Sequence, residues 1–194
     1  MQDRKQLVFF AGLNGAGKTT TYVLACQKIP HLKDLIYINP DILTVREGGD
    51  FIKGARAALT LREESLRRGL SFVFESTFSG NSEIRLLKEA KLKYYKINGV
   101  LVGTDNIDLN LKRISERVMT GGHFVPDEDV RRRAGRLLSN YPSILELTDR
   151  LYLVDNTRKS PKIQAVIKNG EIKLRKHNSA SWINVFLELL KKHS

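Results

Sequence analysis

A glycine-rich loop near the start of the chain has the residue types and spacing of a phosphate-binding site. The segment Gly12-Leu13-Asn14-Gly15-Ala16-Gly17-Lys18-Thr19 matches G-x-x-x-x-G-K-[ST] at every fixed position. Glycines let successive backbone N–H groups converge on a phosphate chain, and the start of the following helix adds partial positive charge. The sequence therefore predicts a loop that binds a nucleoside triphosphate, with ATP as the expected cofactor.

Two side chains of this loop are expected to do chemistry. Lys18 is predicted to reach the outer phosphates and to act in catalysis, and Thr19 is predicted to hold Mg²⁺. The residues predicted to contact the nucleotide are Gly12, Asn14, Gly15, Ala16, Gly17, Lys18, Thr19 and Thr20. The alternative interpretation is an ordinary glycine turn before a helix, which the complete match and the flanking strand and helix patterns disfavour.

An aspartate follows the second apolar strand pattern, in the segment IYINPDIL. Asp41 would lie just past the carboxyl end of a core strand, where open α/β sheets form their ligand crevice. A carboxylate there can accept the proton of an acceptor hydroxyl as that hydroxyl attacks the γ-phosphate. We predict Asp41 to be this base, in contact with the substrate; an N-cap or an outer Mg²⁺ contact is the alternative.

Polar residues also follow the third strand pattern, in FVFESTFSG. Glu75, Ser76 and Thr77 would emerge at the same sheet edge, where a carboxylate and two hydroxyls suit a polar acceptor such as a sugar. The alternative is a capping cluster for the next helix, but Ser79 or Asn81 could serve as that cap. We predict that the three residues bind the substrate.

Arginines gather on two later helix patterns joined by a loop that contains Gly-Gly-His-Phe-Val-Pro. Two such helices resemble a lid that closes over phosphates, because arginine grips phosphate oxygens bidentately. We assign Arg117 and Arg133 to catalysis and Arg136 to ATP binding, and expect the other arginines to form a solvated face. His123, in the connecting loop, is expected to contact the substrate by hydrogen bonding.

The elements that must position these residues alternate along the chain. Short apolar strands are predicted over 7–11, 35–39, 71–75, 95–102 and 150–155, and helices over 17–28, 51–68, 81–93, 106–119 and 127–140. This alternation predicts an α/β fold of the P-loop NTPase kinase type: a central parallel sheet of about five strands with helices on both faces. The lid spans about 106–141. A C-terminal β-hairpin with a turn at Asn169-Gly170, followed by a helix, occupies about 160–193 and is expected to decorate the sheet edge.

Composition and net charge bear on the number of domains, the location of the protein and its partners. The 194 residues are 41% hydrophobic and 28% charged, which fits one domain over 1–194. No apolar run is long enough to span a membrane, and the N-terminus is a poor signal peptide, so we expect a cytoplasmic protein without a membrane partner. Cys26 is the sole cysteine. The net charge of +12 favours anionic partners and keeps nucleic acid open.

The motifs GLNGAGKTT, NPD, FEST, RVMTGGHFVP with a following RRR, and LYLVDN together resemble the zeta-toxin-like P-loop kinases, and most of all the bacterial subgroup often labelled predicted ABC-type ATPase. The resemblance covers residues 5 to 156. It implies phosphorylation of a sugar hydroxyl, with UDP-N-acetylglucosamine as acceptor, and a toxin paired with an antitoxin, which for this basic chain would be an acidic protein. It also implies that Asp41 is the base, that Glu75 lies in the substrate-binding stretch, and that Arg117 and one of Arg131 to Arg136 contact the γ-phosphate.

Three functions follow from these observations. The first is ATP-dependent phosphotransfer to a small hydroxylated acceptor. The second is a kinase of another acceptor class, such as a nucleoside, a nucleic-acid end or a protein. The third is a non-catalytic ATP-binding interaction module. Loss of transfer with retained nucleotide binding in Asp41→Asn would separate the kinases from the third function.

Overall fold

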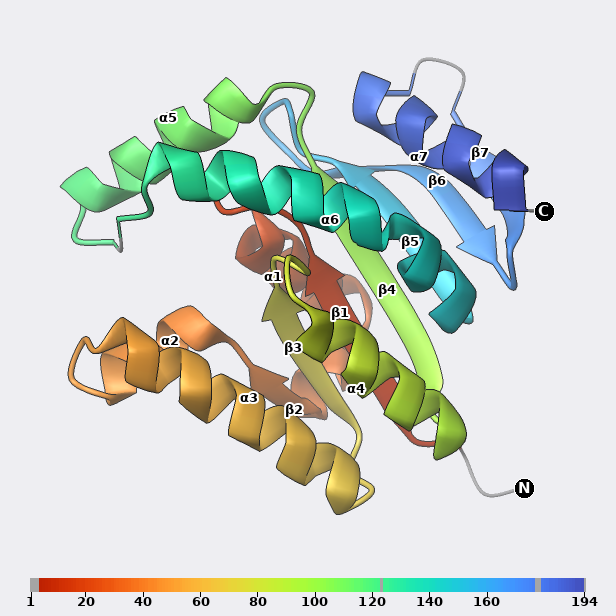
Figure 1. The fold of residues 1–194 in the computed structure, drawn as a ribbon, viewed down its shortest axis with the longest axis horizontal. Coiled ribbons are helices and arrows are strands. Elements are labelled where there is room, and N and C mark those ends of the chain that lie inside the picture. Colours follow the sequence, from red (N-terminus) through yellow and green to blue (C-terminus); the bar gives the residue numbers. More distant parts are fainter. Residues whose placement is uncertain (1–3, 123, 177–178, 194) are drawn as a thin grey trace.

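The computed structural model describes residues 4–122, 124–176 and 179–193, and its centre is one seven-stranded sheet (Figure 1). Five parallel strands come first in the order β2-β3-β1-β4-β5. They are β2 (Ile36–Ile38), β3 (Phe72–Ser76), β1 (Gln6–Ala11), β4 (Lys96–Gly103) and β5 (Arg150–Asp155). All five predicted strands are confirmed, and the P-loop follows the central one.

The C-terminal hairpin lies at the expected edge of the sheet and extends it by two strands. Strand β6 (Lys162–Lys168) pairs antiparallel with β5, and β7 (Glu171–Arg175) pairs antiparallel with β6. Asn169 and Gly170, the predicted turn, both have positive φ, 50° and 78°, as a type I′ hairpin turn requires. The sheet is therefore mixed, with a parallel core of five strands and an antiparallel edge of two.

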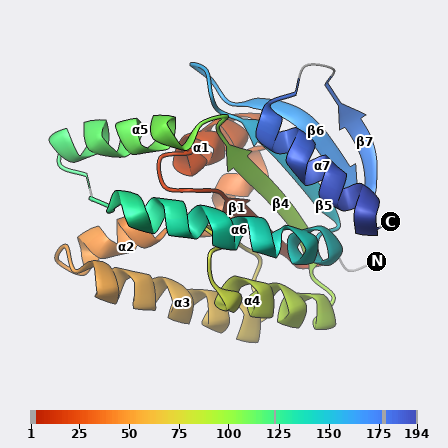
Figure 2. The ribbon, with the colours of Figure 1, turned by 45° about the horizontal axis from the view of Figure 1, so that its top comes forward.

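Helices cover both faces of the sheet, as expected (Figures 1 and 2). They are α1 (Lys18–Lys28), α2 (Pro40–Arg46), α3 (Phe51–Arg67), α4 (Asn81–Leu92), α5 (Ile107–Met119), α6 (Asp127–Leu147) and α7 (Ser181–His193), with a 3₁₀ helix over Pro30–Asp34. Helices α3, α4, α6 and α7 contribute to the large core on one face. Helix α1 and the 3₁₀ helix pack on the other. Among the described residues, no helix has the length and apolar character needed to cross a membrane.

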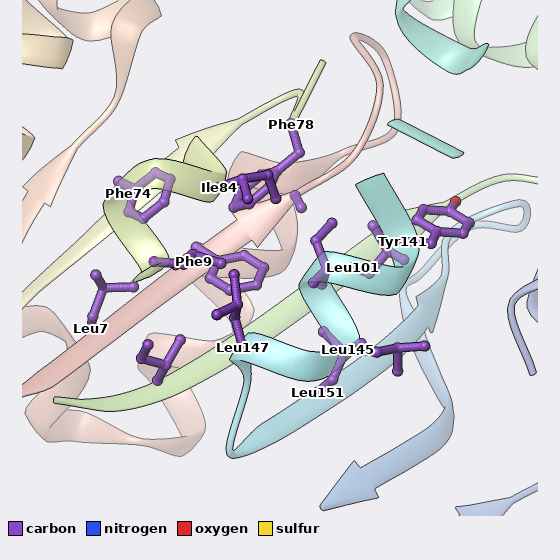
Figure 3. Close-up of a cluster of buried hydrophobic side chains, with 14 of the residues drawn as sticks. Leu7, Phe9, Phe74, Phe78, Ile84, Leu101, Tyr141, Leu145, Leu147 and Leu151 are labelled. Atoms are coloured by element: carbon purple, nitrogen blue, oxygen red, sulfur yellow. The ribbon is translucent and has the colours of Figure 1, made fainter. Parts of the chain in front are cut away.

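The large core is built around aromatic rings from β1 and β3 (Figure 3). The ring of Phe9 lies 4.6 Å from that of Phe78, and Phe74 lies 5.8 Å from Phe78, measured between centroids. Leu145 and Leu147 of α6 pack into the same cluster. Because parallel strands are buried on both faces, their residues are almost continuously apolar, which made them easy to predict.

Two helical segments differ from the prediction. Helix α6 was expected to end near residue 140 but continues through Pro142 to Leu147, because Tyr141 and Ile144 bury their side chains and offset the hydrogen bond that the proline cannot make. Helix α2 was not predicted. It begins after Asn39, whose Oδ1 accepts hydrogen bonds from the backbone N–H of Asp41 at 2.8 Å and of Ile42 at 3.4 Å.

Candidate functional site

The phosphate-binding loop is held in shape by two buried asparagines from outside it. Asn110 Nδ2 of α5 donates to the carbonyl oxygen of Asn14 at 2.8 Å, and Asn156 Nδ2, just after β5, donates to that of Ala16 at 2.8 Å. A Cβ on Gly17 would lie only 2.1 Å from Asn156 Nδ2, and Gly17 has a φ of 89°. These bonds turn loop carbonyls outward, which leaves the N–H groups for a phosphate chain.

Lys18 lies folded over the loop that it follows. Its Nζ donates to the carbonyl oxygens of Gly12 at 3.0 Å and Leu13 at 3.1 Å. Burial lowers the pKa of the Lys18 ammonium, and the negative charge of Glu75 opposes this shift. A half-buried cation that donates to two loop carbonyls is well placed to transfer its hydrogen bonds to incoming phosphate oxygens.

Thr19 and the buried Glu75 belong to one hydrogen-bonded network. Thr19 Oγ1 donates to Glu75 Oε2 at 3.0 Å, and the Tyr37 hydroxyl donates to Glu75 Oε1. Asn39 Nδ2 donates to the Tyr37 hydroxyl at 3.0 Å, which links the network to the start of α2. Hydroxyl and carboxylate oxygens are the ligands that Mg²⁺ prefers, so Thr19 and Glu75 fit a magnesium ion shared with phosphates.

Glu75 is only 4% exposed. Burial raises the pKa of its carboxyl above the usual value, and the charge of Lys18 opposes this shift. Glu75 was predicted to bind the substrate, and it does line the cleft described below. Its hydrogen-bond partners, however, are the predicted metal-binding threonine and a tyrosine, so it can also orient Thr19.

Asp41 occupies the first turn of α2, and the alternative that Asp41 caps this helix is wrong because Asn39 occupies the cap. Its carboxylate faces the lid: Arg117 Nη1 of α5 donates to Asp41 Oδ2 at 3.1 Å. The predicted base and one predicted lid arginine are therefore brought together.

The arginines of α6 differ in their contacts. Arg133 Nη1 donates to the side-chain oxygen of Asn14 in the loop at 2.8 Å. Its Nη2 also lies 3.9 Å from Asp129 Oδ2, which pairs with Arg132 as well, whereas Arg131 pairs with Asp108. Arg136 is exposed and is not among the described residues that line the cleft, so its predicted ATP contact gains no support from the structure.

Arg113 was not among the predicted site residues, although it lies one helical turn before Arg117. It lines the cleft, and its Nη1 is buried with no hydrogen-bond partner among the residues that the structure describes. A buried donor without an acceptor is costly unless a ligand supplies one. The spacing of four residues to Arg117 was the available signal for it.

These groups surround one open cleft of about 970 Å³ at the carboxyl ends of the parallel strands. The predicted residues that line it are Asn14, Gly15, Gly17, Lys18, Thr19, Thr20, Asp41, Glu75, Ser76, Thr77, Arg117 and Arg133. Gly12 and Ala16 lie at the base of the loop, with Ala16 only 1% exposed. His123 lies outside the described residues.

A buried ion pair supports the segment that follows β3. Arg62 of α3 donates from Nη2 to the carbonyl oxygen of Glu75 at 2.7 Å, and its Nη1 lies 3.4 Å from Glu83 Oε1. The same Glu83 oxygen accepts a hydrogen bond from Ser76 Oγ at 2.7 Å. Neither partner was predicted, because the three elements meet only in the folded chain.

Sequence comparison finds one clear relative. No family model matches the chain. A protein of Haemophilus influenzae, described as an uncharacterized protein, is 30% identical over 130 residues, which are 67% of this chain and 93% of that protein.

Structural comparison shows the fold. A chain in the structure of AvrRxo1-ORF1:-ORF2 with ATP superposes with a TM-score of 0.70 at 18% identity over 95% of this chain. This chain spans 64% of the length of that protein. A chain from the PezAT chromosomal toxin–antitoxin system of Streptococcus pneumoniae superposes with a TM-score of 0.59 at 14% identity, covering 98% of this chain and 86% of that one. Together these likenesses confirm the predicted P-loop kinase fold.

Proposed function

We propose that this chain, which belongs to the same family as the Haemophilus influenzae protein and has the fold of the zeta-toxin-like P-loop kinases, is an ATP-dependent phosphotransferase that acts on a hydroxyl of a small acceptor. The observation that carries this proposal is the position of Asp41. Its carboxylate lies in the same cleft as the phosphate loop and is contacted by a lid arginine.

The donor half of the site is formed by the loop and the start of α1. The loop N–H groups and Lys18 would bind the phosphates of ATP, with Lys18 exchanging its carbonyl partners Gly12 and Leu13 for phosphate oxygens. Thr19, oriented by Glu75, would hold Mg²⁺. When bound, this ion neutralises charge on the phosphates.

The acceptor half begins at Asp41. The acceptor oxygen would form a bond to the γ-phosphorus as the bond from that phosphorus to the β,γ-bridging oxygen breaks and ADP leaves. Asp41 would take the proton of the acceptor hydroxyl. Arg117 contacts this carboxylate at 3.1 Å, and would move to the transferring phosphoryl group together with Arg113 and Arg133.

A role as the toxin of a toxin–antitoxin pair is supported by the sequence resemblance and by the likeness to a PezAT chain. The net charge of +12 suits an acidic antitoxin. Induction of the parent chain should arrest bacterial growth, and induction of Asp41→Asn should not. Equal growth in both cultures would contradict a toxin that depends on phosphotransfer.

An acceptor screen tests the phosphotransfer. The protein is incubated with Mg-ATP and UDP-sugars, nucleosides, oligonucleotides or a cell extract, and ADP release and new phosphorylated masses are followed. We expect a phosphorylated product that Asp41→Asn does not form, although this variant binds ATP normally. Asp108→Asn, an equivalent change at an exposed lid aspartate outside the cleft, serves as the matched control. Tight ATP binding without product in any pool would contradict the proposal and favour a non-catalytic module.

A further inference from the structure

Tyr37 of β2 joins the donor and acceptor halves of the site, although it is not among the described residues that line the cleft. Its hydroxyl donates its one proton to Glu75 Oε1 and accepts a hydrogen bond from Asn39 Nδ2 at 3.0 Å. The other carboxylate oxygen of Glu75 accepts the hydrogen bond of Thr19 at 3.0 Å. Because Glu75 and Asn39 are each only 4% exposed, water competes little for the Tyr37 hydroxyl.

Asn39 continues this connection to the helix that carries the proposed base. Its Oδ1 accepts hydrogen bonds from the backbone N–H of Asp41 at 2.8 Å and of Ile42 at 3.4 Å, which caps α2. The side-chain amide thus bonds α2 through its oxygen and Tyr37 through its nitrogen. An unbroken chain of hydrogen bonds therefore runs from the hydroxyl of Thr19 to the backbone of Asp41.

The ring of Tyr37 is held by α1, the helix that starts at the phosphate loop. It stacks on the ring of Tyr22, with the centroids 3.9 Å apart and the planes 8° from parallel. Tyr22 in turn packs against Phe10 of the central strand β1, at 5.5 Å and nearly perpendicular. A ring fixed by packing leaves its hydroxyl little freedom, so this hydroxyl is a preorganised partner for Glu75 and Asn39.

The partners of Tyr37 differ from those of a tyrosine that supports the fold alone. The Tyr95 hydroxyl donates to a backbone oxygen, that of Leu70, at 2.9 Å. The Tyr37 hydroxyl instead uses both its proton and its oxygen on Glu75 and Asn39, two side chains that line the cleft. Groups that orient metal ligands in this way commonly affect metal binding as strongly as the ligands do.

We propose that Tyr37 is a positioning residue. Its hydroxyl orients Glu75 toward Thr19, the residue expected to hold Mg²⁺, and through Asn39 it sets the position of Asp41 relative to that metal site. Tyr37 itself takes no part in bond making. This inference rests on the proposed function, because it needs both the magnesium nucleotide site and the transfer for which Asp41 is the base.

Removal of the Tyr37 hydroxyl tests the link to the metal site. ATP binding is measured by calorimetry in EDTA and in excess Mg²⁺, and the ratio of the two affinities is the magnesium gain. Tyr37→Phe keeps the stacked ring and should bind ATP in EDTA within about twofold of the parent. Its magnesium gain should fall by about tenfold. Tyr22→Phe removes the neighbouring hydroxyl, which interacts with Cys26, and should keep the magnesium gain of the parent.

Replacement of Asn39 tests the link to α2. Asn39→Ser keeps a favourable capping residue, but the serine is too short to reach the Tyr37 hydroxyl. We expect this variant to keep the magnesium gain, whereas label transfer from γ-labelled Mg-ATP into a bacterial cell extract should slow by about tenfold or more because Asp41 is misplaced. Asn106→Ser makes the same change at the cap of α5 and should transfer label within about twofold of the parent.

The results separate this inference from the proposed function. An unchanged magnesium gain in Tyr37→Phe, or an unchanged transfer rate in Asn39→Ser, would overturn the positioning role and leave the phosphotransfer standing. A lower melting temperature of Tyr37→Phe with its magnesium gain intact would assign the hydroxyl to the fold and also overturn that role. A parent protein whose ATP affinity does not rise with Mg²⁺ would overturn the magnesium site and this inference with it.

Discussion

Arg117 of α5 and Asp41 of α2, 76 positions apart in the sequence, are joined by an ion pair of 3.1 Å across the cleft. The pair places a cation from the lid directly on the predicted base. It is half-exposed, with 38% of the Arg117 side chain and 49% of the Asp41 side chain accessible. The contact therefore contributes little to stability, and its effect should appear in catalysis.

Replacing Arg117 with alanine should separate these two effects. We expect the free energy of unfolding to change by less than about 1 kcal/mol, as for other exposed ion pairs. The rate of transfer should fall on the order of 10³-fold, because the arginine would stabilise the transferring phosphoryl group. Urea unfolding and steady-state kinetics measure the two quantities. Arg131→Ala, which removes the exposed pair with Asp108, is the control and should keep its rate.

Arg113 should bind ATP through its buried Nη1. Arg113→Met should weaken ATP binding in a calorimetric titration by about tenfold, the worth of a hydrogen bond to a charged group. The empty protein should lose little stability, since this donor has no partner among the described residues. Lys112→Met changes the neighbouring exposed cation and should bind ATP like the parent. Equal ATP affinity in both variants would contradict this role.

The buried pair of Arg62 and Glu83 should matter for stability. Arg62→Met leaves Glu83 buried without its cation and should lower the free energy of unfolding by about 3–5 kcal/mol. The double variant Arg62→Met, Glu83→Gln should lose less than the sum of the two single changes, because no charge is left unbalanced. Urea unfolding of the four proteins gives this comparison, and additive losses would show that the two residues act independently.

Glu75 should make stability depend on pH in a defined direction. Its folded-state pKa is raised by burial, so its contribution is fully present below the unfolded pKa and is lost as pH rises through the folded pKa. Glu75→Gln lacks this loss. The free energy of unfolding of the variant minus that of the parent, measured in urea with EDTA, should therefore increase from pH 4 towards neutral pH. A difference that stays constant or falls would show that the carboxyl is not titrating as described.

The loop and the parallel strands could be predicted because their signals are local. The glycine spacing before Lys18 and the continuous apolar runs depend on neighbouring residues only, and the structure confirms the elements around them. The short helix α2 was not predicted, because its seven residues are too few to show a helical pattern. The expected end of α6 near residue 140 was wrong because buried side chains continue the helix past Pro142.

The contacts between distant segments could not be predicted in the same way. Tyr37 reaches Glu75 only because β2 and β3 are neighbours in the sheet, with Ile38 opposite Phe74. Asn110 and Asn156 contact the loop from segments about a hundred residues or more away. Likewise, which of the lid arginines face the cleft depends on how α5 and α6 lie over it. The spacing of the arginines in the sequence does not determine that position.

Asn14 is contacted by both lid helices, since Asn110 holds its carbonyl oxygen and Arg133 its side-chain oxygen. A phosphate chain arriving at the loop competes with that side chain for Arg133. We therefore expect occupancy of the donor half to be coupled to the position of α6, with the nucleotide binding first and the acceptor second. Product-inhibition kinetics should show this order, with ADP competing directly against ATP and noncompetitively against the acceptor. The loop would then set the order of substrate binding as well as bind the nucleotide.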